Sequence, residues 1–414
     1  MVMPTQTHTF AWGLVKSIRA AGCPVHLVSA APASTFPRNR KILFRPGRFQ
    51  QDGVQGDLLG FVNLLGVKHL TRFLSAVRSG RRALRRQGSD VLLIHGVHTP
   101  FLWFGVLAAR RRWVRVVPVL TDPPGVALPT DGRIVRGLRR LDRALVRSAL
   151  RRSSGVVVLT AALADDFAPS VPRLVMEGIF NPPSVDPSTS TAIGSVDAAS
   201  EASPSSAKIG PTRALVYAGG LTRAYGVDRL VEAFRGLTAP DLRLFLFGRG
   251  ELEDWLETQA KSDPRVVPPE LLNRDALVKR LARAALLVNP RPVGQSFVRY
   301  SFPSKIIEYL STGVPVVTTR LPGIPPDYER YLLFADSDTV EGLREAMLRA
   351  LALPPEASRA LGAAGAAFVR ETRGPAAQGQ RIRSFLAGLT TISPDQDDVR
   401  AQQRKLPRHE VGRR

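Results

Sequence analysis

The sequence predicts an α/β protein built from two doubly wound domains, each with a parallel β-sheet. Its 414 residues exceed the size at which one hydrophobic core usually stops growing, and 44% of them are hydrophobic. Short apolar, β-branched segments alternate with segments of helical periodicity, as in parallel α/β sheets. A stretch rich in Ser, Pro and Ala at 182–212 separates two halves that each contain such a series.

The first half contains four apolar segments without alternation, which is typical of strands buried on both faces. They are PVHLVSA (24–30), DVLLIHG (90–96), VRVVPVLTD (114–122) and GVVVLTA (155–161). The uncharged stretch Val91–Ala109 also has the length of a membrane span. His95, His98 and Pro100 interrupt it, so we expect a strand, a turn and a helix over 99–109 instead.

The second half repeats this pattern. Its expected strands are ALVYAGG (214–220), LRLFLFGRG (242–250), AALLVNP (284–290) and VPVVTTR (314–320). Helices are predicted at 227–237 and 275–285, with a short one from Ser304 to Ser311 that ends near Gly313. The expected organisation is a first domain at 1–181, a flexible linker at 182–212, a second domain at 213–390 and a disordered basic tail at 391–414.

Charge is unevenly distributed along the chain. Of the formal net charge of +23, residues 1–185 carry +18. A basic half of this kind suits nucleic acid, an anionic membrane or a phosphorylated substrate, or it is a solvated surface of an arginine-rich protein. The single cysteine, Cys23, favours a reducing compartment, and Met1–Phe10 lacks the pattern of a secretory signal, so a cytoplasmic location is predicted.

Glycines follow two expected strands of the second half. Gly219 and Gly220 close one strand, and Gly248 and Gly250 close another. In open parallel sheets, ligands bind outside the carboxyl ends of the strands, and glycine there lets backbone N–H groups approach a phosphate. Glu253 stands where a dinucleotide fingerprint has its third glycine, which argues against a nicotinamide-dependent dehydrogenase.

Lys305 and Glu308 lie in the short helix expected at 304–311. A cation in the first turn opposes the helix dipole and favours a nearby anion. Because residues three apart share a helix face, the two side chains form either an internal salt bridge or two halves of one binding site.

Four segments in this order resemble the C-terminal half of retaining glycosyltransferases of family 4, which have the GT-B fold. They are YAGGLTRAYGVDRLVEAF, FGRGELEDWL, SFPSKIIEYLSTGVPVVTT and LPGIPPDY. The form PSKIIEYLSTGVPVV is similar to members that build exopolysaccharide, capsule or antigen chains. The resemblance is looser over Thr7–Asn181, where EGIFNP resembles the end of the first domain. It implies a nucleotide-diphosphate sugar bound in a cleft between two domains, against the second.

The resemblance also implies roles for residues. Glu308 would accept hydrogen bonds from the ribose hydroxyls, and Lys305 and Arg223 would stabilise the diphosphate as it leaves, with Arg299 as a weaker candidate. The implied donor-binding set is Gly219, Gly220, Arg223, Gly248, Arg249, Gly250, Tyr300, Ser301, Pro303, Ser304, Lys305 and Glu308. Catalytic roles are expected for three residues: Asp122, Lys305 and Arg223. Asp122 ends a first-domain strand, where it would orient the sugar, and the two cations would stabilise the leaving diphosphate.

The sequence departs from the family pattern at several positions. Tyr300 stands where the earlier of two glutamates is usual, and Gly220 and Tyr225 replace a usual arginine and lysine. In the first domain, Thr121 replaces the histidine that often precedes the aspartate. Arg223 is the residue expected to compensate for the missing cations.

His95 and His98 follow the strand DVLLIH and, with Thr121, are acceptor-side candidates; the alternative is that both histidines are structural. The triplet Asp336-Ser337-Asp338 resembles a metal motif of another glycosyltransferase fold but follows the donor region in an expected loop. No metal and no prosthetic group are therefore predicted.

The leading hypothesis is a glycosyltransferase that extends a saccharide or lipid-linked acceptor at the cytoplasmic face of a membrane. The basic stretches at 110–115 and 133–152, with Phe101, Trp103 and Trp113, would contact anionic headgroups. Three alternatives remain open. One is a sugar-nucleotide epimerase or hydrolase of the same fold. Another is a nucleic-acid-binding protein, which charge alone suggests and no zinc-ligand or aromatic RNA-binding motif supports. The last is a charge-driven membrane scaffold without catalysis, if the substitutions in the donor site have abolished turnover.

Overall fold

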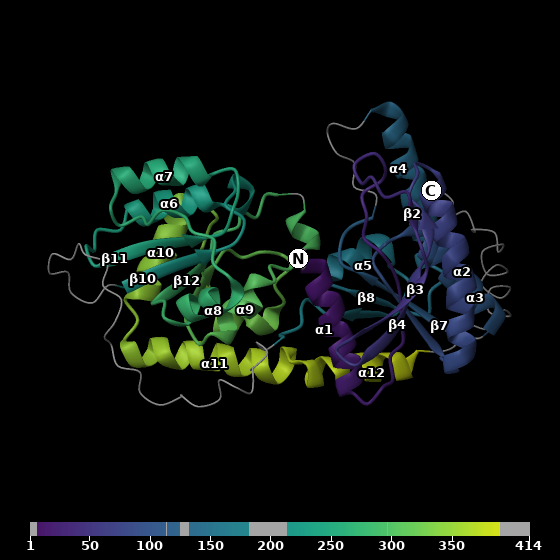
Figure 1. Cartoon of the computed structure of the whole chain (residues 1–414). Coiled ribbons are helices and arrows are strands. Elements are labelled where there is room, and N and C mark those ends of the chain that lie inside the picture. The colour runs from purple at the N-terminus through teal and green to yellow at the C-terminus, as the bar shows by residue number, and fades with distance from the viewer. Residues whose placement is uncertain (1–5, 113, 125–131, 182–212, 296, 390–414) are drawn as a thin grey trace, which may run out of the picture. The chain divides into compact units, whose positions relative to one another are not determined.

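The computed structural model describes residues 6–112, 114–124, 132–181, 213–295 and 297–389 (Figure 1). The chain divides into unit 1, Met1–Met176 with Gly379–Arg414, and unit 2, Glu177–Gln378. The linker expected at 182–212 and the tail expected at 391–414 both lie entirely outside the described residues.

Unit 1 contains a parallel sheet with the strand order β6-β7-β8-β9. Its strands are β6 (Val91–His95), β7 (Arg115–Leu120), β8 (Val156–Val158) and β9 (Arg173–Val175). Three of the four were predicted, and β8 is completely buried, as its unalternated apolar sequence indicates. The short strand β9 was not predicted.

A second sheet of unit 1 was only partly foreseen. It has the order β1-β4-β3, from β1 (Leu27–Ala30), β4 (Val54–Leu59) and β3 (Gly47–Gln51), and a separate pair joins β2 (Leu43–Phe44) to β5 (Phe61–Val62). The expectation that 24–30 is buried on both faces was wrong. β1 is an edge strand, and Val28 is exposed. The hairpin of β3 and β4 turns at Asp52 and Gly53, both with positive φ.

The helices of unit 1 are α1 (Gln6–Ala20), α2 (Val67–Gln87), α3 (Thr99–Arg112), α4 (Arg133–Leu150) and α5 (Ala161–Phe167). The uncharged stretch 91–109 forms β6, a turn at Gly96 and α3, which confirms the strand-turn-helix prediction. Within the described ranges, no helix has both the length and the apolar character needed to cross a membrane.

Unit 2 contains a five-stranded sheet that is parallel throughout, with the order β11-β10-β12-β13-β14. Its strands are β10 (Arg213–Ala218), β11 (Leu242–Phe247), β12 (Leu286–Asn289), β13 (Val316–Thr318) and β14 (Leu333–Phe334). All four predicted strands are present. Leu215 pairs with Leu244 on one side and Leu286 on the other, so β10 is an interior strand and its carboxyl end is flanked by two others.

Helices cover both faces of this sheet (Figure 1). They are α6 (Val227–Arg235), α7 (Glu253–Ser262), α8 (Arg274–Ala282), α9 (Lys305–Ser311), α10 (Val340–Leu351) and α11 (Pro355–Arg373). One buried cluster joins the sheet to α6 and α10, and the other joins it to α9 and α11. With the parallel sheet of unit 1, this arrangement confirms the predicted α/β class with two doubly wound domains.

The last described helix, α12 (Pro375–Gly388), belongs to both units. The sequence placed it in the second domain, whereas residues from Gly379 onward pack within unit 1. Arg383 donates a hydrogen bond to the carbonyl of Ala21, and Arg115 donates one to the carbonyl of Leu386. The sequence of α12 could not predict its packing in unit 1, because these two hydrogen bonds join it to residues more than 270 positions away along the chain.

Candidate active site

Two glycine turns meet at the carboxyl end of β10 in unit 2. The N–H of Gly219 donates to the carbonyl of Phe247 at 2.7 Å. A Cβ atom on Gly248 would lie 1.8 Å from the carbonyl oxygen of Gly219, and one on Gly250 would lie 2.3 Å from that of Leu221. The turns after β10 and β11 are therefore in backbone contact, and this contact requires glycine at positions 248 and 250.

Lys305, in the first turn of α9, reaches this glycine turn. Its ammonium donates a hydrogen bond to the carbonyl of Ala218 and lies 4.9 Å from the ring centroid of Tyr217. A Cβ atom on Gly219 would lie 1.3 Å from Nζ, so the ammonium occupies space that only glycine leaves open. Burial lowers the pKa of Lys305 to about 8, against the opposing influence of Glu308.

Glu308 lies one turn further along α9 and is exposed. Within the described residues no ion pair joins it to Lys305, whose ammonium turns towards β10 instead. The internal salt bridge considered from the sequence is thus absent. Although the residue reaches solvent, the protein groups packed around its carboxylate partly desolvate it and raise the pKa of Glu308, while the charges of Lys305 and Arg274 act in the opposite direction.

Arg223 and Arg249 lie in the two glycine turns, as expected, but both are paired with carboxylates. Arg223 begins the 3-10 helix η2 (Arg223–Tyr225) and contacts Asp228 at 3.3 Å. Arg249 pairs with Glu253, which also accepts a hydrogen bond from the N–H of Gly250 at 2.8 Å. Glu253 therefore stabilises the start of α7, which gives a structural reason for a glutamate at that position.

The segment before α9 contains the remaining donor candidates. Tyr300 ends the 3-10 helix η3 (Val298–Tyr300), and the Arg299 guanidinium lies 5.7 Å from its ring centroid. Pro303 is buried and Ser304 is exposed at the start of α9. The hydroxyl of Ser301 is buried and has no hydrogen-bond partner in the described part of the chain.

Arg291 was not selected from the sequence. It follows β12 in the segment NPRP, directly after a predicted strand, and its guanidinium lies 5.2 Å from the ring centroid of Tyr225 and 4.6 Å from that of Phe297. Burial lowers its pKa. The position of a cation immediately after a buried strand could have suggested Arg291 from the sequence. Its contacts with the two aromatic rings could not be predicted, because those rings come from other segments of the chain.

In unit 1, His95 and Asp122 lie at the ends of neighbouring strands, because β6 pairs with β7 in parallel. Burial lowers the pKa of His95, and the charge of Asp122 acts to raise it. Within the described residues, His95 Nε2 is buried without a hydrogen-bond partner. Thr121 donates to Asp122 at 2.9 Å, so the structure brings together three of the first-domain candidates.

His98 lies just beyond, before α3. Its ring meets Phe101 edge to face, with 6.0 Å between centroids. Burial lowers its pKa, and the charges of Arg72, His69 and Lys68 lower it further, against Asp142. His98 is therefore a neutral group beside a basic surface near pH 7.

Asp336 and Asp338 have local partners. Asp336 pairs with Arg349 at 2.9 Å, and Asp338 accepts a hydrogen bond from the N–H of Val293 at 2.9 Å and contacts Arg229 at 3.5 Å. Within the described residues, no group of three or more His, Cys, Asp or Glu side chains could hold a metal ion. Asp338 thus joins the segment after β12 to α6, and Asp336 pairs with α10.

The basic surface of unit 1 differs from the one expected. Phe101 packs against a buried cluster, and the ring of Trp103 lies beneath Arg152 with its Nε1 buried. Trp113 lies outside the described residues. Eight exposed apolar side chains of unit 1 lie instead on or beside α2 and α4: Leu65, Val67, Leu70, Leu74, Val135, Leu138, Leu141 and Leu145.

Known proteins match both halves of the chain. Residues 7–174 match the model of the glycosyl transferase 4-like domain, and residues 212–352 match the model of glycosyl transferases group 1. The two models together cover most of the chain. No curated protein sequence matches it.

Several solved structures share the fold. Sucrose-phosphate synthase from Thermosynechococcus elongatus is 16% identical over 92% of this chain and 94% of its own, with a TM-score of 0.62. A trehalose-6-phosphate structure from E. coli, bound with UDP-2-fluoro glucose, is 12% identical over 95% and 98%, with a TM-score of 0.60. The Anabaena protein HepE in complex with UDP is 14% identical over 93% and 97%, also with a TM-score of 0.60. The two domain matches and this shared fold show that the chain is a glycosyltransferase of the GT-B type.

Proposed function

We propose that this glycosyltransferase transfers a sugar from a nucleotide-diphosphate sugar to a saccharide or lipid-linked acceptor, with retention at the anomeric carbon. The observation that carries the proposal is the position of Lys305. Its ammonium is held at the glycine turn after β10, without an ion-pair partner in the described residues. A cation at the carboxyl end of a parallel sheet suits a diphosphate, and its charge stabilises the diphosphate as it leaves.

The proposed roles of the other residues follow from their chemistry. Glu308 is exposed on the same helix and can accept hydrogen bonds from both ribose hydroxyls. Arg223 is a further catalytic cation once it exchanges Asp228 for the ligand. Asp122 orients the transferred sugar, and His95, His98 and Thr121 line the acceptor side. The structures of HepE with UDP and of the E. coli protein with UDP-2-fluoro glucose support a uridine nucleotide as the first donor to test.

We further propose a role in polysaccharide or cell-envelope glycan synthesis, at the cytoplasmic face of a membrane. The support is the resemblance of PSKIIEYLSTGVPVV to exopolysaccharide-type enzymes and the surface of α2. A groove there is lined by Leu74, Val77, Arg78, Arg81, Arg82, Arg85 and Arg86. Exposed leucines beside arginines suit an anionic lipid surface, where each basic residue contributes about 1 kcal/mol before screening.

Product analysis tests the transfer reaction. The protein is incubated with UDP-, GDP- or dTDP-linked glucose and a lipid-linked saccharide extract, and the product is characterised by NMR. The proposal expects release of the nucleoside diphosphate, consumption of acceptor and retention of the anomeric configuration. Release of free sugar, or a change of sugar configuration in the nucleotide without acceptor consumption, would instead indicate the hydrolase or the epimerase.

Vesicle sedimentation tests the membrane role separately. At physiological salt, vesicles containing anionic lipid are expected to bind wild type, and the variant Arg81→Glu/Arg82→Glu is expected to bind several-fold more weakly. The matched control, Arg235→Glu/Arg320→Glu, reverses the same charge on exposed arginines of unit 2. Equal binding by the α2 variant, or no binding by wild type, would contradict the membrane role and leave the transfer reaction untouched.

A further inference from the structure

Arg291 has a fixed backbone beside the glycine turn of β10. Its carbonyl accepts a hydrogen bond from the hydroxyl of Thr319 at 2.5 Å. Gly226 has φ of 74°, and a Cβ atom there would lie 2.2 Å from the carbonyl oxygen of Pro290. The segment after β12 is thus held against the segment after β10, which places Arg291 next to Tyr225.

Two aromatic rings orient the Arg291 guanidinium. Tyr225 and Phe297 lie 5.2 and 4.6 Å from it, so its planar group has an aromatic contact from each of two segments. Its Nε is buried and has no hydrogen-bond partner in the part of the chain that the structure describes. No carboxylate pairs with it among those residues. The hydrogen-bonding capacity of this guanidinium is therefore not used up by the described protein groups and remains open to an acceptor on a ligand.

The ring of Tyr225 also accounts for Gly220. A Cβ atom on Gly220 would lie 2.8 Å from Cε2 of Tyr225, so the ring fills the space into which a side chain at 220 would project. Residue 220 therefore has no side chain of its own at this point of the turn, and the ring of Tyr225 fills the space. The cation beside that ring is Arg291, from the segment after β12.

Arg291 and Lys305 form a pair of like charges. The two charges lie close enough to interact, because the charge of Arg291 lowers the pKa of Lys305. Both also act on Tyr217: Arg291 acts to lower the pKa of its hydroxyl, and the ammonium of Lys305 lies over its ring. Two neighbouring cations without carboxylate partners are unfavourable unless an anion joins them. A diphosphate has two charged groups and can accept two parallel hydrogen bonds from a guanidinium.

We infer that Arg291 is the second cation of the donor site and binds the diphosphate of the nucleotide together with Lys305. This inference rests on the proposed function, and it adds a residue after β12 that needs no exchange of partners, unlike the arginines of the two glycine turns. Those two are paired with Asp228 and Glu253. The rings of Tyr225 and Phe297 preorganise the guanidinium, so less conformational entropy is lost when the ligand binds.

The test compares each nucleoside diphosphate with its monophosphate by isothermal titration. UDP, GDP and dTDP are titrated into wild type, and the best of them is carried forward with its monophosphate and nucleoside. Arg291→Gln is expected to weaken diphosphate binding at least tenfold and to change nucleoside binding less than twofold, and Arg291→Lys is expected to recover part of the loss. Unchanged nucleoside binding shows that the variant is folded.

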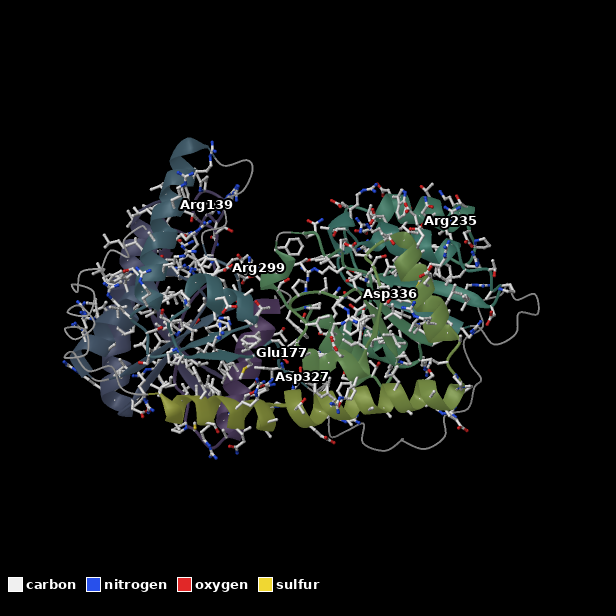
Figure 2. All side chains as sticks on the ribbon, turned by 180° about the vertical axis from the view of Figure 1, so that it is seen from behind. Arg139, Glu177, Arg235, Arg299, Asp327 and Asp336 are labelled. Atoms are coloured by element: carbon white, nitrogen blue, oxygen red, sulfur yellow. The ribbon has the colours of Figure 1, made fainter. Side chains whose placement is uncertain are left out.

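Arg235→Gln is the matched control, because Arg235 is an exposed arginine of α6. In Figure 2 it lies well away from Arg299, which belongs to the segment between Arg291 and α9. It is expected to bind all ligands like wild type. If wild type binds a diphosphate and Arg291→Gln binds it equally well, the inference about Arg291 is wrong and the proposed function stands. If wild type binds none of the three diphosphates, the proposed function itself fails.

Discussion

Gly219 and Lys305 share one space, because a Cβ atom on residue 219 would lie 1.3 Å from the ammonium nitrogen of Lys305. The two residues are 86 positions apart in the chain, and the parallel order β10-β12-β13 brings the start of α9 to the end of β10. The glycine is therefore needed for the position of the cation as well as for the turn.

Gly219→Ala is the direct test of this relationship. The added methyl group is expected to displace the ammonium, to weaken nucleoside-diphosphate binding at least tenfold and to lower stability by about 1–3 kcal/mol through overpacking. Titration calorimetry and denaturant unfolding measure the two effects. Gly313→Ala is the control, since φ of 79° strains alanine there without any neighbour within 4 Å. It is expected to lose stability and keep its affinity; equal affinity of both variants would contradict the shared space.

The pKa of about 8 for Lys305 predicts how diphosphate binding depends on pH. A bound diphosphate stabilises the charged ammonium, so binding above pH 8 requires uptake of a proton. Affinity is expected to fall about twofold from pH 7 to 8 and roughly 30-fold in all by pH 9.5. The variant Lys305→Arg, whose side chain stays charged, is expected to lack this decline. The same decline in both proteins would assign it to another group.

The free energy of unfolding depends on pH in the opposite direction to diphosphate affinity: it rises as Lys305 loses its proton. The folded-state pKa of Lys305 lies below its unfolded value of 10.5, so the unfolded chain binds more protons between pH 8 and 10.5. The energetic cost of burying the charge is fully present below pH 8 and is relieved as the pH rises through that range. Lys305→Met is expected to be more stable than wild type at pH 7, with a difference that shrinks towards pH 10.5. A constant difference in chemical unfolding would show that the ammonium is not desolvated.

A buried ion pair in unit 2 predicts a large loss of stability. Arg373 and Glu177 have side chains that are 7% and 2% exposed, and Tyr328 donates a hydrogen bond to the same carboxylate at 3.0 Å. Asp327 is a second partner of Arg373, and Figure 2 shows Glu177 and Asp327 near each other. Arg373→Met leaves the Glu177 charge buried without its partner and is expected to cost about 3–5 kcal/mol in denaturant unfolding. The double variant Arg373→Met/Glu177→Leu is expected to be more stable than the single one; an equally large loss would mean that packing dominates.

His95 predicts a loss of stability in acid. Burial lowers its pKa in the folded state below the ordinary value of 6.5, so the unfolded chain binds the proton more readily. The stability contributed by keeping His95 neutral is complete above pH 6.5 and declines as the pH falls below that value. His95→Phe is expected to show a weaker decline between pH 7 and 5, measured as the change in denaturant midpoint. An identical decline would show that His95 titrates normally.

The parallel strands and the donor helix were predictable because their sequences carry local signals. β10 and β12 are buried on both faces, so they are apolar without alternation, and Gly313 ends the segment containing α9 with φ of 79°. The hairpin of β3 and β4 was not predictable. Its β3 sequence GRFQQ is mostly exposed and polar, and its partner strand alone defines it as a strand.

The candidate site was only partly accessible from the sequence. Lys305 could be selected because a cation in a first helical turn is locally unfavourable, but its hydrogen bond to Ala218 depends on the strand order. Arg291 has only the weak local signal of following a buried strand, because its environment is created by Tyr225 and Phe297, which tertiary structure alone brings together. Conversely, Arg249 looked available in the sequence and is paired with Glu253 in the structure.

The most direct test of the donor site is a titration of UDP-, GDP- and dTDP-glucose into wild type and two variants. Lys305→Met removes the cation at the glycine turn, and Glu308→Gln removes the carboxylate proposed for the ribose. Wild type is expected to bind at least one of the three sugar nucleotides, each variant to bind it at least tenfold more weakly, and Arg235→Gln to bind it like wild type. Binding of equal strength by wild type and both variants, or no binding by wild type, would contradict the donor site at Lys305 and Glu308.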